Sequence, residues 1–595
     1  MKKAILIILA LCGAVALMLA FAAGVFGLAG LLGKERVAAR TVLELDLEQP
    51  FVEFVPDDPI AQAMMGQAST VRDLVDALER AGRDKNVAGL VARVGGGGQG
   101  MAIIQEIRDA VTAFREQGKF AVAFAETFGE VGPGNGGYYL ATAFDEIWLQ
   151  PSGDIGLTGL IYESPFIHRA LGKMGVTPRM DHRYEFKNAM NMFTETAYTE
   201  AHKLSMERLM ESQFNQIVRD VGAARGLEES RVRALFDHGP FLGQEAVEAG
   251  LVNGLSYRDE VWSRVKERGG KGAKLLFLHK YLERAGRPHT SGPTIALIYG
   301  VGAVRRGQSG YDGLFGDAAM GSDSVTAAFR AAVEDKAVKA ILFRVDSPGG
   351  SYVASDAIWR ETLRAREAGK PVIVSMGNLA GSGGYFVAMD AHKIVAQPGT
   401  ITASIGVLGG KMLTEGMWEW LGIDWDEVHT SAQGRMWSGT SDYSPEEWSR
   451  FQAWLDRVYE DFTTKVAAGR KMPIEKVREV AKGRIWTGED GQDIGLVDEL
   501  GGYATALALA KEAAGVAASD SVTLTVFPRR VEGWEEWLAK QMFKGGGDRE
   551  NSEARAVAAL LQRVQPTARM ARQVGLVPPA GGYGVLSMAP FVAAP

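Results

Sequence analysis

"DKNVAGLVARV" at residues 84–94 recurs as "DKAVKAILFRV" at residues 335–345, a shift of 251 positions. Two further stretches repeat in the same order. "GNGGYYLATAFDEIWLQP" (134–151) returns as "GSGGYFVAMDAHKIVAQP" (381–398), shifted by 247, and "FLGQEAVEAGLVNGL" (241–255) as "WTGEDGQDIGLVDEL" (486–500), shifted by 245. Self-similarity at a steady spacing is the mark of a duplicated structural unit. The chain is therefore predicted to hold two homologous domains, joined near "HTSGPTIALIYG" (289–300).

Each copy alternates strand and helix patterns. In the second copy "AVKAILFRV" (337–345) is typical of a buried strand, "ASDAIWRETLRAREAG" (354–369) of an amphipathic helix, and "PVIVSMG" (371–377) of the next strand. A helix is expected near Gly383, followed by a strand at 393–398. This alternation predicts an α/β fold with mostly parallel sheets and helical crossovers. A long helix over 444–470 is predicted to open with a capping box, Ser444 with Glu447.

Composition excludes several classes of function. The chain has 595 residues and a formal net charge of −7 without long charge runs, which argues against nucleic-acid binding, because phosphates require a basic face. The single cysteine, Cys12, excludes an intramolecular disulfide and a thiolate-rich metal site. We expect no metal and no cofactor.

The N-terminus carries a long apolar segment. Residues 4–33 contain no charged side chain, and these 30 residues exceed the roughly 20 that an α-helix needs to cross a bilayer. A cleaved signal peptide is the alternative, but its apolar region is about 7–15 residues long. We therefore expect an uncleaved anchor. The flanking charges, Lys2 and Lys3 against Lys34 and Arg36, give little contrast for orientation.

Two stretches of the second copy suggest acyl-transfer chemistry. "RVDSPGGS" (344–351) ends a strand with Gly349 and Gly350, whose backbone N–H groups could serve as an oxyanion hole, although a plain tight turn fits the same residues. Ser404 in "TITASIGVLGG" (400–410) and Ser382 in "LAGSGGYF" (379–386) are candidate nucleophiles among small residues. Their counterparts in the first copy are Leu157 and Asn135, so only the second copy offers a hydroxyl.

A serine nucleophile needs a base, and two kinds are available. His182 and His429 occupy equivalent places in the two copies, which favours a structural role. Lys187 lies in the apolar stretch "YEFKNAMNMF" (184–193), and its counterpart is Gly434. Burial would lower the pKa of a lysine from about 10.4 and leave a neutral amine able to accept a proton. The losses are complementary, because one copy lacks the serine and the other lacks the lysine.

With these residues the chain resembles the long, duplicated form of the signal peptide peptidase A (protease IV) family, of the Clp-protease/crotonase superfamily. The resemblance covers about residues 40–510 and rests on "RVDSPGGS", "GSGGYF", "TASIG" and "TGEDGQDIGLVD" in the second copy and "YEFKNA" in the first. It departs at Asp346, where asparagine is common, and at Ala403, where glycine often precedes the nucleophile. Neither departure removes a catalytic group.

The resemblance implies a membrane-anchored serine endopeptidase that degrades cleaved signal peptides. Ser404 would be the nucleophile and Lys187 the general base, with Gly349, Gly350 and Gly383 holding the oxyanion and Ser382 lining the site. It also implies apolar peptide substrates, a homotetramer that imitates a ring of eight single domains, and a single-pass protein of the inner (plasma) membrane with its catalytic domains on the periplasmic side.

The expected organisation has four parts. They are a cytoplasmic N-terminus and transmembrane anchor (1–36), a Clp/crotonase-like domain with the lysine (37–290), a second such domain with the serine (291–545) and a flexible tail (546–595). Two alternatives remain: a crotonase-type acyl-CoA enzyme, for which no acidic base or CoA pocket is found in the sequence, and a catalytically inactive membrane scaffold. The sequence does not decide whether Ser404 and Lys187 meet within one chain or between subunits.

Overall fold

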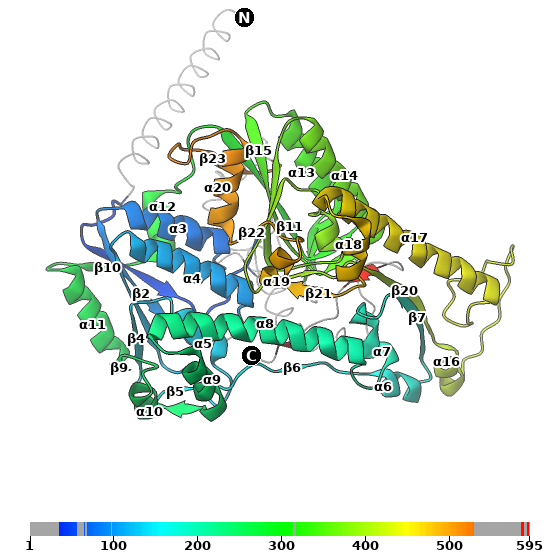
Figure 1. The fold of residues 1–595 in the computed structure, drawn as a ribbon, viewed down its shortest axis with the longest axis horizontal. Coiled ribbons are helices and arrows are strands. Elements are labelled where there is room, and N and C mark those ends of the chain that lie inside the picture. Colours follow the sequence, from blue (N-terminus) through cyan, green and yellow to red (C-terminus); the bar gives the residue numbers. More distant parts are fainter. Residues whose placement is uncertain are drawn as a thin grey trace, which may run out of the picture.

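Two mainly parallel β-sheets, one in each copy of the repeat, form the frame of the molecule (Figure 1). The computed structural model describes residues 35–55, 65, 68–96, 98–312, 317–528, 585–587 and 592–593. In the first sheet the order is β10-β1-β2-β3-β4-β9, and every neighbouring pair is parallel. The bounds are β1 Thr41–Asp46, β2 Val87–Arg93, β3 Phe120–Ala125, β4 Glu146–Leu149, β9 Gly254–Leu255 and β10 Lys274–Phe277.

The second sheet has the order β21-β19-β17-β15-β11-β23, with β18 beside β17 and β22 beside β18. All pairs are parallel except β19 with β21. The bounds are β11 Thr294–Val301, β15 Val338–Ser347, β17 Val372–Gly381, β18 Lys393–Ala396, β19 Ile401–Ala403, β21 Ile485–Thr487, β22 Glu499–Leu500 and β23 Thr523–Val526. The predicted α/β fold with parallel sheets is confirmed.

Helices cover the sheets in layers. One apolar core joins the first sheet, helices α3, α4, α12 and α20, and one face of the second sheet; the other face packs on α13, α14 and α17. Helix α11 covers the outer face of the first sheet. The bounds are α3 Val71–Arg83, α4 Met101–Glu116, α11 Arg258–Gly269, α12 Leu278–Ala285, α13 Ser322–Glu334, α14 Tyr352–Glu367, α17 Pro445–Arg470 and α20 Tyr503–Ala513.

The elements of the two copies correspond. Strand β2 matches β15, β3 matches β17, β4 matches β18, and the short helix α5 (Asn135–Ala141) matches α15 (Gly383–Phe386). Helix α8 (Glu200–Arg225) and α17 both have 26 residues, and Thr199 and Ser444 cap them with their hydroxyls. The predicted capping box of Ser444 and Glu447 is present. Strand and helix predictions for residues 337–398 are therefore confirmed, with β17 four residues longer than the pattern that ends at Gly377.

Smaller elements connect the two copies. Strand β7 (Thr177–Arg183) of the first copy pairs antiparallel with β20 (Val407–Leu413) of the second, and this ribbon leads outward to α16 (Figure 1).

A smaller mixed sheet has the order β13-β14-β12-β16-β24. Its strands are β12 Ala303–Arg305, β13 Gly310–Asp312, β14 Asp317–Gly321, β16 Gly349–Ser351 and β24 Val585–Ser587. Other elements are β5 Asp154–Ile155, β6 Tyr162–Glu163, α6 His168–Lys173, η1 Asn188–Met190, α7 Asn191–Thr194, α9 Glu229–His238, β8 Phe241–Leu242, α10 Gly243–Glu248, α16 Glu415–Leu421, α18 Ile474–Val480, α19 Gly488–Asp493 and β25 Val592–Ala593.

The predicted anchor at residues 1–36 lies outside the described residues except for its last two. Across the part of the chain that is described, no helix has the length and apolar character to cross a bilayer. Of the predicted tail, 546–595, only β24 and β25 are described.

Candidate active site

The pairing of β7 with β20 brings the two halves of the predicted site together. In that ribbon Arg183 lies opposite Val407. Lys187 follows Arg183 by four residues, and Ser404 precedes Val407 by three, so the antiparallel register places both at the same end of the ribbon. A lysine of the first copy and a serine of the second thus meet within one chain.

The Lys187 amine lies at the centre of a small buried cluster. Its Nζ atom is 2.8 Å from Ser382 Oγ, 2.9 Å from the Ser404 carbonyl oxygen and 3.1 Å from Ser404 Oγ. Lys187 is 1% exposed, Ser404 2% and Ser382 0%. Among the described residues no carboxylate lies within 4.0 Å of this amine. Desolvation by burial lowers the pKa of Lys187 to about 7.

Three residues around the cluster have left-handed backbone conformations. The φ angles are +66° at Ala403, +52° at Ser404 and +54° at Ser382. A side chain in this region costs about 1–2 kcal/mol, and such strain is typically concentrated at functional sites. Glycine adopts a positive φ without that cost, so Ala403 bears strain where the resembling family often has glycine.

Hydrogen bonds fix the strained serines. The Ser382 amide donates to the Ala403 carbonyl at 2.7 Å, and the Ser404 amide donates to the Arg484 carbonyl at 2.9 Å. Gly483 packs directly against Lys187, since a Cβ atom there would lie 2.5 Å from Lys187 Cβ. Gly483 was not among the predicted site residues, because its surroundings, "KGRIW" (482–486), carry no signal of this contact.

The three predicted oxyanion glycines lie together. A Cβ atom on Gly383 would be 3.0 Å from the Gly350 amide nitrogen and 3.1 Å from Gly349 Cα. Gly383 directly follows Ser382, which ties this group to the lysine cluster. The Gly349 amide already donates to Ser347 Oγ at 3.2 Å. The backbone at Gly349 has φ +97°, which favours glycine.

The two histidines that were alternative bases lie elsewhere. His182 lies in β7, where its backbone pairs with Leu408, and its Nδ1 is buried without a hydrogen-bond partner. His429 is on the exposed side of the second copy, 3.8 Å from Glu427. Neither ring forms a hydrogen bond to Ser404 or Ser382 within the described ranges, so the structure brings Lys187, and not a histidine, to the serines.

Asp346, a departure from the resembling family, lies behind the glycine turn. Its carboxyl oxygen accepts a hydrogen bond from the Leu379 amide at 2.9 Å. Burial and the neighbouring Glu53 raise the pKa of Asp346 to about 7. A protonated carboxyl has nearly the shape of an asparagine side chain, which explains how aspartate fits here.

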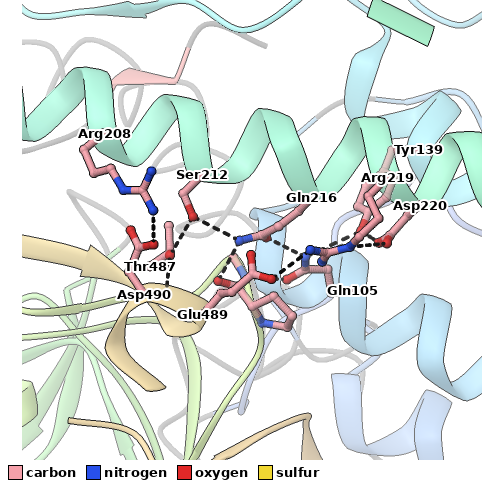
Figure 2. A network of polar contacts seen from close by, with 12 residues as sticks. Gln105, Tyr139, Arg208, Ser212, Gln216, Arg219, Asp220, Thr487, Glu489 and Asp490 are labelled. Carbon is pink, nitrogen blue, oxygen red and sulfur yellow. Dashed lines mark hydrogen bonds and ion pairs between the residues drawn. The ribbon is translucent and has the colours of Figure 1, made fainter. Parts of the chain in front are cut away.

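Helix α8 of the first copy forms hydrogen bonds to the second copy next to β19, the strand that ends just before Ser404. Figure 2 shows its polar face against the second copy: Ser212 Oγ lies 2.8 Å from Thr487 Oγ1, and Gln216 donates to the Pro398 carbonyl at 3.1 Å. Gln213 donates to the Gly399 carbonyl at 3.0 Å. Thr487 pairs with Ile401 of β19, which ends one residue before Ser404.

A buried arginine provides a second connection between the copies. Arg344 Nη2 lies 2.7 Å from both Glu53 and Glu106 of the first copy, and the arginine is fully buried. It lies on β15, three residues before Ser347 of the glycine turn. Removing one partner of such a buried ionic group leaves an uncompensated charge, which costs about 3–5 kcal/mol.

No group of three or more histidine, cysteine, aspartate or glutamate side chains suited to holding a metal occurs in the described part of the chain.

Comparison with known proteins identifies relatives over most of the chain. The sequence profile of peptidase family S49 matches residues 113–271 and 364–517, one segment in each copy. "Serine protease SPPA, chloroplastic" from Arabidopsis thaliana is 31% identical over 460 residues, which are 76% of this chain and 66% of that protein. "Protease 4" from Salmonella typhi is 31% identical over 462 residues, 75% of this chain and 72% of that protein. "Protease 4" from Haemophilus influenzae is 30% identical over 462 residues, 74% of this chain and 72% of that protein. The chain thus spans just under two thirds of the length of the plant relative.

The structure of a ClpP1 mutant from Listeria monocytogenes aligns with part of this chain. It covers 36% of this chain and 94% of its own at 14% identity, with a TM-score of 0.22, a value too low to inform the fold.

Proposed function

The chain belongs to peptidase family S49, and from that premise we propose that it is a serine endopeptidase with Ser404 as nucleophile and Lys187 as general base. The observation that carries the proposal is the 3.1 Å separation of Lys187 Nζ and Ser404 Oγ in a buried cluster without a carboxylate. The named relatives support the protease activity; the Ser/Lys pair is inferred from the geometry.

The contacts of Lys187 fit a neutral amine. A neutral amine has two N–H donors and one lone pair. The Ser404 carbonyl can only accept, and Ser382 Oγ lies in reach of the second N–H. The lone pair is then left for the Ser404 hydroxyl proton. An amine with a pKa of about 7 is about half neutral at neutral pH, so it can act as a general base there.

The reaction follows from these positions. Ser404 Oγ bonds to the peptide carbonyl carbon while its proton moves to Lys187 Nζ. The carbonyl oxygen becomes an oxyanion near the amides of Gly350 and Gly383, because the Gly349 amide donates to Ser347 Oγ instead. The Lys187 ammonium returns the proton to the leaving amine as the C–N bond breaks, which leaves an acyl-enzyme. Water then attacks the ester with Lys187 again as base, and the acid product leaves.

We propose the membrane location and the substrates of the protein from its sequence. The charge-free residues 4–33 would anchor the protein in the plasma membrane, with the catalytic part on the extracytoplasmic side. Apolar, extended peptides such as signal-peptide remnants would be its substrates, as the family resemblance implies.

Hydrolysis of an apolar peptide by the detergent-solubilised chain tests the proposal. We expect Ser404→Ala and Lys187→Ala each to reduce kcat by at least about 10³-fold, because the two groups act as one unit. His182→Ala and His429→Ala serve as controls and should stay near the unaltered rate. A peptidase-inactive chain, or one that keeps activity without Lys187, would contradict the proposal.

We also propose that the duplication closes a ring of four chains. Gly175 after α6 and Gly422 after α16 both have a left-handed φ, +70° and +71°, and are 247 residues apart, so the segments around them correspond. By this equivalence, residues 424–430 correspond to β7, and residues 160–166 to β20. Within one chain β7 and β20 pair with each other. The corresponding segments, 160–166 and 424–430, would then pair between neighbouring subunits.

The exposed apolar side chains support this assembly. Large apolar residues that are at least 43% exposed gather on these segments and next to them: Ile161, Trp420, Leu421, Ile423, Trp425 and Val428. Exposed large apolar side chains that follow one another along a segment, as from Trp420 to Val428, are typical of an interaction site. Such an interface would join Leu157 of one chain to Gly434 of the next, positions without catalytic groups, so each complete site would lie within one chain.

A further inference from the structure

Strand β17 contains a bulge shortly before the proposed site. Against β15, its register runs from Val345 opposite Met376 to Ser347 opposite Ala380, so β17 has two more residues than β15 over this interval. Such an insertion bends the strand and changes its direction. Two residues of extended chain correspond to about 7 Å. The bulge therefore determines how far along the sheet the end of β17 lies, next to Ser382.

The bulge also changes the neighbour of β17. Before the bulge, β17 pairs with β18 as far as Ser375. After the bulge, it pairs with β19, and Gly381 lies opposite Ala403. Ser382 and Ser404 directly follow these two residues. The pairing that begins at the bulge therefore fixes the two serines relative to one another.

Two side chains of the second copy bind the ends of the bulge. Asp346 Oδ1 accepts a hydrogen bond from the Leu379 amide at 2.9 Å. Thr400 Oγ1 donates to the Gly377 carbonyl at 2.8 Å. A bulge interrupts the ladder between strands, so its backbone groups need partners of this kind. The remaining residue of the bulge, Asn378, contacts the first copy instead.

Asn378 caps a helix of the first copy. Its Oδ1 accepts a hydrogen bond at 3.1 Å from the amide of Ile103, the third residue of α4. The N-cap residue of that helix is Gly100, which has no side chain to accept this bond. A Cβ atom on Gly100 would overlap the amide group of Asn378, so the asparagine takes the place of a capping side chain. The bulge is thereby attached to the beginning of α4.

We propose that Asn378 is a positioning residue, which ties the bulge of β17 to α4 and so holds the Ser382 hydroxyl and the Gly383 amide in place beside Ser404. This inference rests on the proposed function, in which the Gly383 amide faces the oxyanion. Asn378 acts through the backbone that follows it, since it precedes Ser382 by four residues. A shift of an oxyanion donor weakens an interaction made in the transition state, so it lowers kcat and changes KM little.

Moving the helix cap from β17 to α4 separates positioning from stability. Asn378→Ala removes the acceptor of the Ile103 amide and should lower Tm by about 2 °C. Adding Gly100→Ser puts a capping hydroxyl on α4 itself, in the space that the asparagine leaves. Gly100 has φ −69° and ψ 154°, which suit a serine cap, so Tm should recover while the bulge stays unattached. Asn378→Asp is the matched control, because it keeps the acceptor oxygen.

The rate on an apolar peptide anilide tells the two roles apart. We expect kcat to fall at least fivefold in Asn378→Ala and to stay equally low after Gly100→Ser is added, with KM within twofold in both chains. The kcat of Asn378→Asp should stay within twofold of the unaltered chain. A kcat that recovers with the moved cap, or one that never falls, would overturn the inference and leave the peptidase intact.

Hydrogen exchange gives a second readout that needs no activity. The Ser382 amide donates to the Ala403 carbonyl at 2.7 Å, a bond that depends on the pairing of β17 with β19. In the chain with the moved cap, we expect exchange in residues 379–386 to be at least threefold faster than in the unaltered chain, and exchange in α4 to be unchanged. Faster exchange in a chain that hydrolyses nothing would support the attachment and reject the proposed function. Unchanged exchange in residues 379–386 would overturn the inference.

Discussion

At the scale of residues, the proposed chemistry depends on one lysine, Lys187, which is buried away from water and has no carboxylate partner among the described residues. The Lys187 amine has hydroxyl and carbonyl partners only, and burial therefore disfavours its charged form. Because burial is the cause of the lowered pKa, the pKa depends on the segments that keep water from the amine and not on a neighbouring charge.

Activity should follow the deprotonation of this amine. The neutral form is the active one, so kcat/KM should be low at pH 5, rise through about pH 7 and level off above it. Rates on an unionisable peptide ester between pH 5 and 9.5 check this. A flat profile, with acylation shown to be rate-limiting, would contradict the assignment of Lys187 as base.

In the proposed mechanism Ser382 acts as a positioning residue for Lys187. Its hydroxyl lies 2.8 Å from Lys187 Nζ, so Ser382→Ala should lower kcat by about 10- to 100-fold, less than the loss of the base itself. The pH midpoint should move as well, because an acceptor of the amine is lost, and Ser382→Thr should restore part of the rate. A complete loss equal to that of Ser404→Ala would contradict a positioning role.

Much of the site could be predicted at this scale. The complementary loss of serine and lysine between the copies singled out Ser404 and Lys187, and the structure brings them together. The contacts of Ser382 and Gly483 with the lysine could not be predicted, because they depend on which backbone segments approach one another in space. The sequence around a small loop residue does not indicate which distant segment it will contact.

At the scale of elements, the ribbon of β7 and β20 is what makes the site. A slip of two residues in its register would move Lys187 about 7 Å from Ser404, since a strand rises about 3.4 Å per residue. Alternating strand and helix patterns predicted the sheets, but the sequences of β7 and β20 do not indicate that these two strands pair. Pairing between strands some 230 residues apart is a tertiary property.

Gly483 tests how tightly this packing fixes the base. Gly483→Ala would place a Cβ atom 2.5 Å from Lys187 Cβ at a residue with φ +83°, so the lysine must shift. A displacement of about 1 Å can cost about 100-fold in kcat. Gly369→Ala is the matched control, because it has a similar φ of +74° and open space around it. Gly369→Ala should lose about 1–2 kcal/mol of stability through backbone strain, and Gly483→Ala at least as much because the Lys187 backbone must also shift, but only Gly483→Ala should lose activity. Equal kcat values would contradict the account.

At the scale of the whole molecule, duplication accounts for the single proposed site in each chain, because the serine and the lysine come from different copies. The repeat itself could be predicted from spacing alone, and the layered arrangement of both sheets on a shared core follows from the apolar faces of α3 and α4. The positions of the tail strands could not, because "VLS" (585–587) is too short to predict a strand or its partner.

The ring of four chains can be tested by crosslinking across the expected strand pair. Leu408 lies opposite His182 in the ribbon, so by the repeat shift Ile161 of one chain should lie opposite His429 of the next. In a Cys12→Ser background, Ile161→Cys with His429→Cys should give disulfide-linked species of up to four chains on oxidation. Ile161→Cys with Glu427→Cys, two residues out of register, should link poorly. A monomer by light scattering, or equal linking in both pairs, would contradict the ring.

Trapping of the acyl-enzyme tests the Ser/Lys assignment as a whole. The chain is mixed with the p-nitrophenyl ester of a short apolar peptide, quenched in acid within milliseconds, and examined by intact mass and peptide mapping. We predict one acyl group per chain, on the peptide that contains Ser404, with an acylation rate that rises through about pH 7 and falls at least about 10³-fold in Lys187→Ala. An acyl group on Ser382 or elsewhere, or an undiminished rate without Lys187, would contradict it.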